Sequence, residues 1–367
     1  MNQNRRMLVL CPYPQGVAAG QRLKYEQYFD DWRAAGWDIT VSSFMDRPMW
    51  EVIWSEGNLV AKAMGTARGH LRRLFDMLRV WRYDLVYVFM WVTPFGTSVL
   101  ERLTRAQARA LIYDVEDNIL IQQEAAAKKA RDLIARLFKA PGKARYLIRT
   151  SDHVITSSPF LNDQCLQINA KRACTYISSS VDTERFRPAK RHSDDGPLVI
   201  GWTGTFSSKM YLDILRGVFQ RLALKLPFQL MVIGNFDYEL PGVDLEVVRW
   251  TAEREVEDLQ MFDIGVYPLP IDDWVLGKSG LKAIQYMAFG LPCVATEVGT
   301  TPQLIRDGEN GLLVRSEAEW EDALERLARD PELRQRLGKA ARADAVARYS
   351  LEAIAGLYRG VIDQVAA

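Results

Sequence analysis

The sequence has few of the residues that build disulfides and zinc sites. Its 367 residues include only four cysteines and three histidines. The cysteines, Cys11, Cys165, Cys174 and Cys293, are far apart and form no CxxC pair, which indicates reduced thiols in a cytoplasmic setting. The histidines are equally dispersed. Neither a disulfide framework nor a metal site is therefore predicted.

Long apolar runs and low-complexity tracts are also missing. The apolar run near the start, Met7 to Cys11, is far too short for a signal-peptide core or a membrane span. We therefore expect a cytoplasmic protein. The length is about twice that of a usual domain, which predicts two domains.

Charge is unevenly divided along the chain. The formal net charge is +1. Residues 1–182 carry 25 Lys and Arg against 18 Asp and Glu, and residues 183–367 carry 22 against 28. The first half therefore has an excess of +7 and the second half −6. This asymmetry indicates an anionic partner for the N-terminal half.

Apolar, β-prone runs alternate with helical patterns in two series. The first series has strands at 7–11, 38–43, 84–90, 110–114 and 153–158, with helical periodicity at 21–35 and 94–108. The second has strands at 198–202, 228–234, 245–249, 263–268 and 292–296, and final helices at about 317–330, 332–348 and 350–365. The alternation predicts parallel sheets in an α/β protein, as two doubly wound Rossmann-like domains that face a central cleft.

A charged stretch at 185–197, bounded by prolines, separates the two series. We expect an N-terminal domain at 1–184 and a second domain at 185–348. A C-terminal helix at 349–367 is expected to pack back on the first domain.

The stretch 277–314 combines a glycine turn, a helix and a strand. Gly277 and Gly280 permit a tight turn before the helix. Backbone N–H groups at such a helix start attract phosphate, and Lys278 and Lys282 would add charge there. The alternative is a solvent-facing first turn with two ordinary surface lysines.

Three passages resemble the family 4 retaining glycosyltransferases, which have the GT-B fold. "SSSVDTERFRP" (178–188) is similar to the family's domain junction, and "IGWTGTFSSKMYLDIL" (200–215) to its G-R-L-x-x-x-K-G loop. The block at 262–314, with its Q-Y-M-A-x-G-x-P helix, is similar to the donor-binding block. The "GKSG-LK" variant resembles a bacterial subgroup that makes cell-surface polysaccharides.

The chain departs from the family pattern at several positions. Gln285 stands where the family has the second of two glutamates, on the nucleotide ribose, and its amide can still bond a diol. The first glutamate position falls on Gly277 without a gap, or on Asp272 or Asp273 if "DWVLG" is a short insertion. We prefer the insertion, because it keeps an acid in the cleft. Thr205 replaces the usual arginine, and Lys209 lies one residue short of the usual lysine. Lys278 and Lys282 are then expected to clamp the diphosphate.

The resemblance implies a donor site in the second domain and an acceptor site in the first. The residues assigned to donor binding are Gly204, Thr205, Lys209, Trp250, Thr251, Asp273, Ser279, Gly280, Leu281 and Gln285. The residues assigned to catalysis are Lys278, Lys282, Asp272 and Asp114. The residues assigned to the acceptor are Gly16, Arg22, Glu116 and Asp117.

Simpler roles remain open for three of these features. The acids at 114–117 would equally serve as a helix cap before 118–130. Arg22 would equally be a surface residue, and Trp250 a core tryptophan.

The implied reaction moves a sugar from a UDP- or GDP-linked donor. Lysines and a helix N-terminus stabilise the leaving diphosphate without a metal, and no enzyme nucleophile is implied. Two rivals are a nucleotide-sugar epimerase of the same fold and a non-catalytic binding homologue. An NAD enzyme is disfavoured, because neither glycine loop reads G-x-G-x-x-G with a following acid.

Two stretches of the N-terminal half, 62–84 and 128–149, mix arginines or lysines with aliphatic and aromatic residues. Such helices bind anionic bilayers, so we expect a lipid-linked saccharide acceptor and peripheral attachment to the inner face of the cytoplasmic membrane. The alternative is that each apolar stripe packs on the domain core. No nucleic acid partner is expected.

Overall fold

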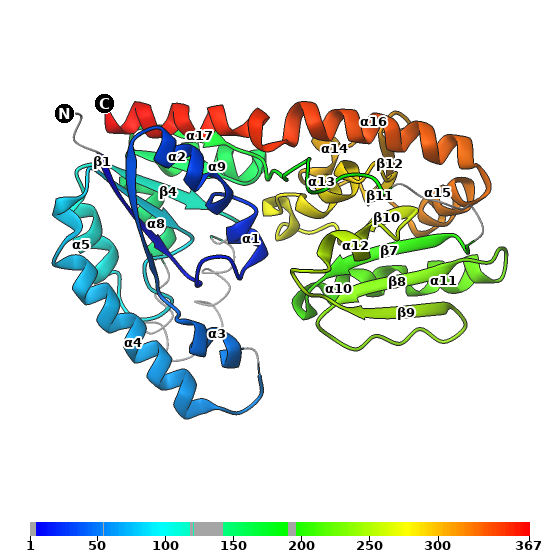
Figure 1. Cartoon of the computed structure of the whole chain (residues 1–367), viewed down its shortest axis with the longest axis horizontal. Coiled ribbons are helices and arrows are strands. Elements are labelled where there is room, and N and C mark those ends of the chain that lie inside the picture. The colour runs from blue at the N-terminus through cyan, green and yellow to red at the C-terminus, as the bar shows by residue number, and fades with distance from the viewer. Residues whose placement is uncertain (1–4, 54, 118–119, 121–141, 190–195) are drawn as a thin grey trace. The chain divides into compact units, whose positions relative to one another are not determined.

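The structure, a computed structural model, describes residues 5–53, 55–117, 120, 142–189 and 196–367. The chain divides into two compact units (Figure 1). Unit 1 comprises Met1–Ser178, Gly277–Ser279 and Ile354–Ala367, and unit 2 comprises Ser179–Leu276 and Gly280–Ala353.

Unit 1 is built on a six-stranded parallel sheet in the order β2-β1-β3-β4-β5-β6. The strands are β1 (Arg5–Cys11), β2 (Trp37–Ser43), β3 (Leu85–Phe89), β4 (Leu111–Val115), β5 (His153–Thr156) and β6 (Cys174–Tyr176). Five of them were predicted, because each is an apolar run between turn residues. β6 was missed, since it is only three residues long and half-buried.

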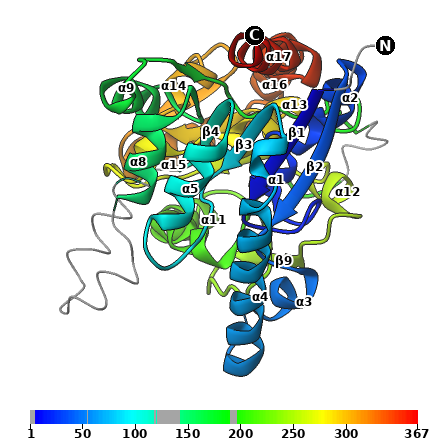
Figure 2. The same cartoon turned by 90° about the vertical axis from the view of Figure 1, so that its left-hand side faces the viewer.

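Helices connect these strands and cover the sheet. They are α1 (Ala19–Arg22), η1 (Glu26–Tyr28), α2 (Phe29–Ala34), α3 (Arg47–Ile53), α4 (Leu59–Met77), η2 (Val80–Arg82), α5 (Val99–Gln107), α8 (Lys143–Thr150) and α9 (Pro159–Ile168). The helix predicted at 21–35 is divided among the first three. Figure 2 shows α3 beside α4, where Met49 contacts the position of Gly65.

Unit 2 repeats the design with a parallel sheet in the order β12-β11-β10-β7-β8-β9. The strands are β7 (Val199–Gly204), β8 (Gln229–Gly234), β9 (Asp244–Arg249), β10 (Ile264–Tyr267), β11 (Cys293–Thr296) and β12 (Gly311–Val314). Alternate side chains of β7 enter two hydrophobic cores, Val199 on one face and Ile200 and Trp202 on the other. The sheet is therefore covered on both faces, as the apolar runs predicted.

Helices connect the strands of the second half, and the last three follow one another almost without a break. They are η3 (Phe206–Ser208), α10 (Lys209–Leu212), η4 (Asp213–Leu215), α11 (Arg216–Ala223), α12 (Glu255–Leu259), η5 (Val275–Gly277), α13 (Leu281–Ala288), α14 (Thr301–Leu304), α15 (Glu317–Arg329), α16 (Pro331–Tyr349) and α17 (Leu351–Ala366). No helix in the described ranges is long and apolar enough to cross a membrane.

The end of α17 packs in unit 1. The Tyr358 ring centroid lies 4.9 Å from that of Tyr28 and 5.8 Å from that of Trp32. Arg359 adds an ion pair of 3.4 Å with Asp31. These aromatic contacts attach the last helix to the first α/β segment of the chain.

Candidate active site

In unit 2, β7 ends at Gly204 in a turn that is packed closely around this glycine. A Cβ at Gly204 would lie 2.3 Å from the Trp202 ring and 2.6 Å from Ser208 Oγ. Thr205 follows and caps η3, since the Thr205 backbone N–H donates to Ser208 Oγ at 3.1 Å. The turn is thereby fixed at the carboxyl end of a central strand, where α/β sheets bind ligands.

Lys282, in the first turn of α13, reaches this turn. Its Nζ lies 3.4 Å from Ser208 Oγ and 4.7 Å from the centroid of the Trp202 ring. Trp202 is fully buried, and its Nε1 has no hydrogen-bond partner among the residues that the structure describes. A half-buried cation over an aromatic ring can meet an anion at small reorganisation cost.

Lys209 lies on the same side of unit 2. Its Nζ donates to the Asp237 carbonyl at 3.3 Å and lies 5.8 Å and 5.7 Å from the ring centroids of Phe236 and Tyr238. Within the described ranges Lys209 forms no ion pair. Lys209 is therefore a second cation near the carboxyl end of β7.

The start of α13 has the glycine geometry that the sequence indicated. Gly280 caps the helix with φ of 75°, in the left-handed region, and a Cβ there would lie 2.3 Å from Leu304. Ser279 is buried and Leu281 packs on the core of unit 2. These residues shape the turn.

Gln285 is buried at 5% exposure, one helical turn after Leu281. Its Nε2 donates to Glu255 Oε1 at 3.4 Å, and Glu255 is also 3.8 Å from Arg185. The amide therefore adjoins a carboxylate on α12 that the sequence reasoning missed. The sequence offered only a weak indication of this contact, because Glu255 is an acid at the first position of a helix, where acids are common.

The remaining donor-site candidates of unit 2 lie in loops. Trp250 is half-buried against the core, and Thr251 Oγ1 accepts from the Arg254 N–H at 3.3 Å. Asp272 and Asp273 are exposed, and Asp272 Oδ1 accepts from the Val275 N–H at 3.0 Å. Trp250 thus combines a core face with an open face, and Asp272 caps η5.

In unit 1, Asp114 lies at the end of β4 but is held inside the core. Lys24 Nζ is 2.5 Å from Asp114 Oδ1, and Tyr87 donates its hydroxyl to Oδ2. All three side chains are buried. Burial raises the pKa of Asp114, while Lys24 and Tyr87 oppose this effect. Both carboxylate oxygens already have partners, so a direct contact with an acceptor hydroxyl would require this group to open.

Lys24 was missed by the sequence reasoning. It stands four residues before Tyr28 and eight before Trp32, and both of these are buried. A lysine in the buried phase of a helical pattern was the available signal, because it requires an acidic partner inside the fold.

Glu116 follows β4 and lies against the first glycine-rich loop. A Cβ at Gly20 would lie 2.8 Å from Glu116 Oε2. Burial raises the pKa of Glu116 to about 7, with Asp117 and Asp114 adding to the effect and Lys24 and Lys278 opposing it. A carboxyl group with this pKa can exchange a proton near neutral pH.

Asp117 is next to it, with φ of 56°. Its Oδ1 lies 2.9 Å from Nζ of Lys278, which clusters with unit 1. Lys282 clusters with unit 2, so the two lysines predicted as one clamp have different surroundings. The helix predicted after these acids, at 118–130, lies outside the described residues apart from residue 120.

Gly16 and Arg22 belong to the loop before the first helices. Gly16 has φ of 82° and donates its N–H to Glu26 Oε2 at 2.8 Å. Arg22 is half-buried and ends α1. Their roles at an acceptor stay predictions.

Across the described part of the chain, no cluster of three or more His, Cys, Asp or Glu residues is arranged to hold a metal ion. The groups available for chemistry are therefore lysines beside aromatic rings in unit 2 and paired acids in unit 1.

Residues 197–330 match the family described as "Glycosyl transferases group 1". The D-inositol 3-phosphate glycosyltransferase of Arthrobacter sp. (strain FB24) is 28% identical over 293 residues. That alignment covers 71% of this chain and 66% of the relative, so the chain spans just under two thirds of the relative's length.

Two solved structures show the same architecture. Sucrose-phosphate synthase (tll1590) from Thermosynechococcus elongatus has a TM-score of 0.72 at 18% identity, with 98% of this chain and 100% of that chain covered. Anabaena Alr3699/HepE in complex with UDP-glucose has a TM-score of 0.63 at 14% identity, with 98% and 99% covered. The predicted pair of doubly wound domains is confirmed. The chain therefore has the GT-B fold of these structures, and its residues 197–330 are similar to the glycosyl transferases group 1 family.

Proposed function

We propose that this protein transfers a sugar from a nucleotide-sugar donor to a hydroxyl group of an acceptor, with retention of the anomeric configuration. The observation that carries the proposal is Lys282, placed over Trp202 beside the Ser208 turn in the group 1 domain. A leaving nucleoside diphosphate needs such fixed positive charge as its bond to the sugar breaks. The names of the relatives and the UDP-glucose bound to Alr3699/HepE support this donor class.

Lys209 and the start of α13 are assigned to the same diphosphate. Lys278 is the further phosphate ligand in this proposal, released from Asp117 when the donor binds. Gln285 is assigned to the ribose, Trp250 and Thr251 to the base, and Asp273 to the sugar. No metal is required, because side-chain cations supply the charge.

The acceptor is proposed to be a lipid-linked saccharide of cell-surface polysaccharide synthesis. Glu116 and Asp117 would orient its hydroxyl groups, and Gly16 and Arg22 would line the approach. Asp114 would act through the position of β4 rather than by direct contact, because Lys24 and Tyr87 hold it.

The first experiment is a thermal-shift screen of UDP- and GDP-sugars without metal. A ligand that binds the folded state raises the unfolding midpoint, so the correct donor should stand out. Release of nucleoside diphosphate with and without saccharide acceptors then separates transfer from epimerisation and from binding alone. An NMR spectrum of the product that shows inverted configuration would contradict the retaining assignment.

A further inference from the structure

Helix α4 and the turn after it point most of their large apolar side chains into solvent, although Met77 and Val80 are buried in the core. Leu71 is 55% exposed, Phe75 67%, Leu78 70% and Trp81 53%. The periodicity of this stretch left open whether its apolar stripe packs on the core. The structure places the stripe outside.

The inward side of α4 is filled by other groups. A Cβ at Gly65 would lie 2.7 Å from Met49, and one at Gly69 would lie 2.7 Å from the Phe44 ring. These glycines bring the helix backbone close to α3 and to the end of β2. At these two positions no room is left for a larger side chain.

Arg73 completes the inward side. It is fully buried, donates to the carbonyls of Cys11, Ser42 and Val92, and pairs with Asp76 at 3.1 Å. The network fixes the rotation of α4 about its own axis. A buried ion pair therefore holds the apolar stripe outward.

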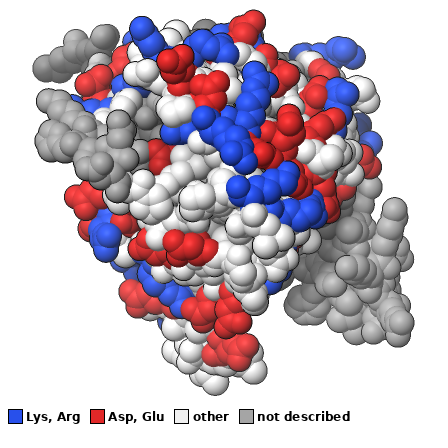
Figure 3. All heavy atoms as spheres, turned by 90° about the vertical axis from the view of Figure 1, so that its right-hand side faces the viewer, with Lys and Arg blue, Asp and Glu red and all other residues white. Residues whose placement is uncertain are grey.

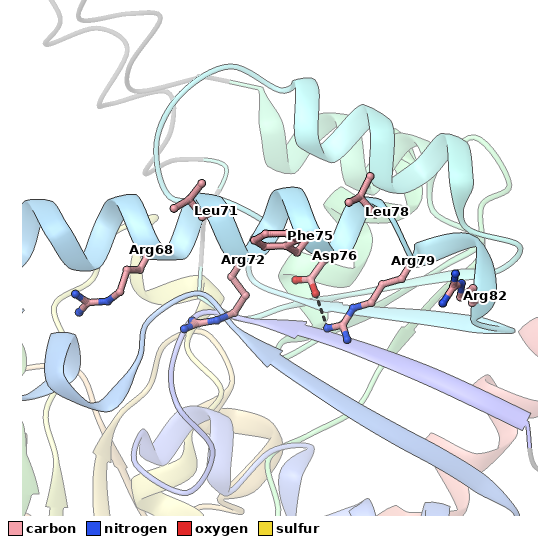
Figure 4. Close-up of a pocket in the computed structure, with 8 residues that line it drawn as sticks. All are labelled: Arg68, Leu71, Arg72, Phe75, Asp76, Leu78, Arg79 and Arg82. Atoms are coloured by element: carbon pink, nitrogen blue, oxygen red, sulfur yellow. Dashed lines mark hydrogen bonds and ion pairs between the residues drawn. The ribbon is translucent and has the colours of Figure 1, made fainter.

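The chain between Leu59 and Arg82 is cationic, with one lysine, five arginines and a single acid, Asp76. Arg73 is buried, and Arg68 and Arg79 pair with Asp46 and Asp76, each at 2.7 Å. Arg72 and Arg82 form no ion pair among the described residues. Arg82 lies 5.1 Å from the centroid of the Trp81 ring. Figure 4 shows Leu71, Phe75 and Leu78 along the helix, with arginines directed to the adjacent side. The residues that line this hollow are Arg68, Leu71, Arg72, Phe75, Asp76, Leu78, Arg79 and Arg82.

The surface of unit 2 differs. Figure 3 shows Lys and Arg mixed with Asp and Glu there, and α11 pairs Arg221 and Lys225 with acids of α15. A second copy seated on α4 would set one cationic surface against another. An anionic lipid surface complements both the arginines and the apolar stripe.

We propose that the α4 face, defined as Leu71, Leu74, Phe75, Leu78 and Trp81 with the flanking arginines, docks on an anionic lipid bilayer. The apolar side chains enter the acyl boundary, and the arginines lie at the level of the lipid phosphates. This proposal deepens the proposed function, because it assigns membrane attachment to one helix. It rests on the proposed function only in the assumption that the acceptor is lipid-linked.

The second basic stretch does not contribute such a face where it is described. Residues 128–141 lie outside the described residues. In α8, Leu147 and Ile148 are fully buried and Lys143 pairs with Glu101 at 3.3 Å. The expectation of a membrane-facing stripe is therefore wrong for α8, which packs on the core.

The test is co-sedimentation of the full chain with vesicles, without donor or acceptor. Phosphatidylcholine vesicles are compared with vesicles that also contain phosphatidylglycerol, at ionic strengths of about 0.01 M and about 1 M. Binding should require phosphatidylglycerol and fall at the higher salt. Vesicle binding and nucleotide-sugar turnover are measured separately. A chain that does not bind vesicles but still turns over a nucleotide sugar would contradict this proposal and not the proposed function.

Two variants locate the surface. Phe75→Ser with Leu78→Ser should weaken binding by about tenfold or more, since two inserted side chains are lost. Arg82→Gln should weaken it about fivefold, the equivalent of one interfacial arginine. The controls are Leu224→Ser, at an 88% exposed leucine of unit 2, and Arg33→Gln, at an arginine beside the Phe29 ring.

Light scattering and fluorescence complete the design. Quenching by brominated lipids should be smaller for Trp81→Phe than for the parent, which tests insertion even if the double variant misfolds. Several outcomes would overturn the proposal: no binding to anionic vesicles at low salt, equal binding to neutral ones, equal binding of all variants, or a dimer that Phe75→Ser dissociates.

Discussion

Both units have lysines near the carboxyl ends of their strands, but these lysines differ in burial and in their contacts. In unit 1, Lys24 is 1% exposed and paired with Asp114. In unit 2, Lys209 and Lys282 are half-buried beside aromatic rings. A lysine near the carboxyl end of a strand therefore does not by itself identify a ligand site. Its burial and its ion-pair partner decide whether it can contact a ligand.

The buried lysine of unit 1 and the half-buried lysines of unit 2 should also differ in what their removal costs. A buried pair is costly to break, since removal of one partner leaves an uncompensated charge. A half-buried lysine over an aromatic ring can stabilise the charge that develops on a phosphate. The comparison predicts that Lys24 variants lose stability and that Lys209 and Lys282 variants lose activity.

The largest effect is expected for Lys24→Met. It would strand the Asp114 carboxylate in the core and should lower the free energy of unfolding by about 3–5 kcal/mol. Denaturant unfolding measures this change. Lys24→Met with Asp114→Asn should recover part of the loss, and equal stability of Lys24→Met and the parent would contradict the assignment.

Lys282→Met should leave unfolding almost unchanged and lower turnover about 10²–10³-fold, as expected for loss of one stabilising group in the transition state. Initial rates with the donor found by the thermal-shift screen measure it. Lys339→Met, at an exposed lysine of α16, is the matched control. A normal rate for Lys282→Met would remove this residue from the proposed diphosphate site.

The third prediction concerns Glu116, which should make the stability of the protein depend on pH. Because its folded pKa, about 7, lies above the usual 4.5, the folded state holds the proton more tightly. This contribution to stability is present below about pH 4.5 and is lost as pH rises through about 7. The stability of Glu116→Gln relative to the parent should therefore increase from pH 5 to pH 8.

Denaturant unfolding of both proteins at the two pH values gives this difference. Lys24, Asp114, Asp117 and Lys278 are the charged groups that act on Glu116. The same relative stability at pH 5 and pH 8 would show that Glu116 is ionised normally in the folded protein.

Much of the fold could be predicted from the sequence, because it depends on local patterns. Helices α15, α16 and α17 end within a residue of the predicted bounds. β12, with only four residues, was read as part of a motif rather than as a strand. The bounds of the long elements follow from periodicity and caps, whereas short strands depend on neighbours that are distant in sequence.

The candidate site was predictable to a smaller extent. The glycine turn before α13 and the place of Lys282 follow from local spacing. The Lys24–Asp114 pair joins residues 90 positions apart, and the outward stripe of α4 depends on Arg73, which contacts Cys11 and Val92. Periodicity shows that a helix is amphipathic but not which side faces the core.

The smallest effects distinguish the two glycine loops. Gly204→Ala should cost about 1–3 kcal/mol, because its Cβ would overlap the buried Trp202 ring. A Cβ at Gly16 would meet no atom within 4 Å, but the φ of this residue is 82°. Gly16→Ala should therefore cost only about 1 kcal/mol, from backbone strain alone.

Asparagine separates the two causes, because it tolerates the left-handed region better than alanine but is larger. Gly16→Asn should be less destabilising than Gly16→Ala, whereas Gly204→Asn should be more destabilising than Gly204→Ala. Denaturant unfolding of the four variants measures both orders. If alanine and asparagine ranked alike at the two positions, the positions would share one constraint, and the contrast between the open position of Gly16 and the packed position of Gly204 would fail.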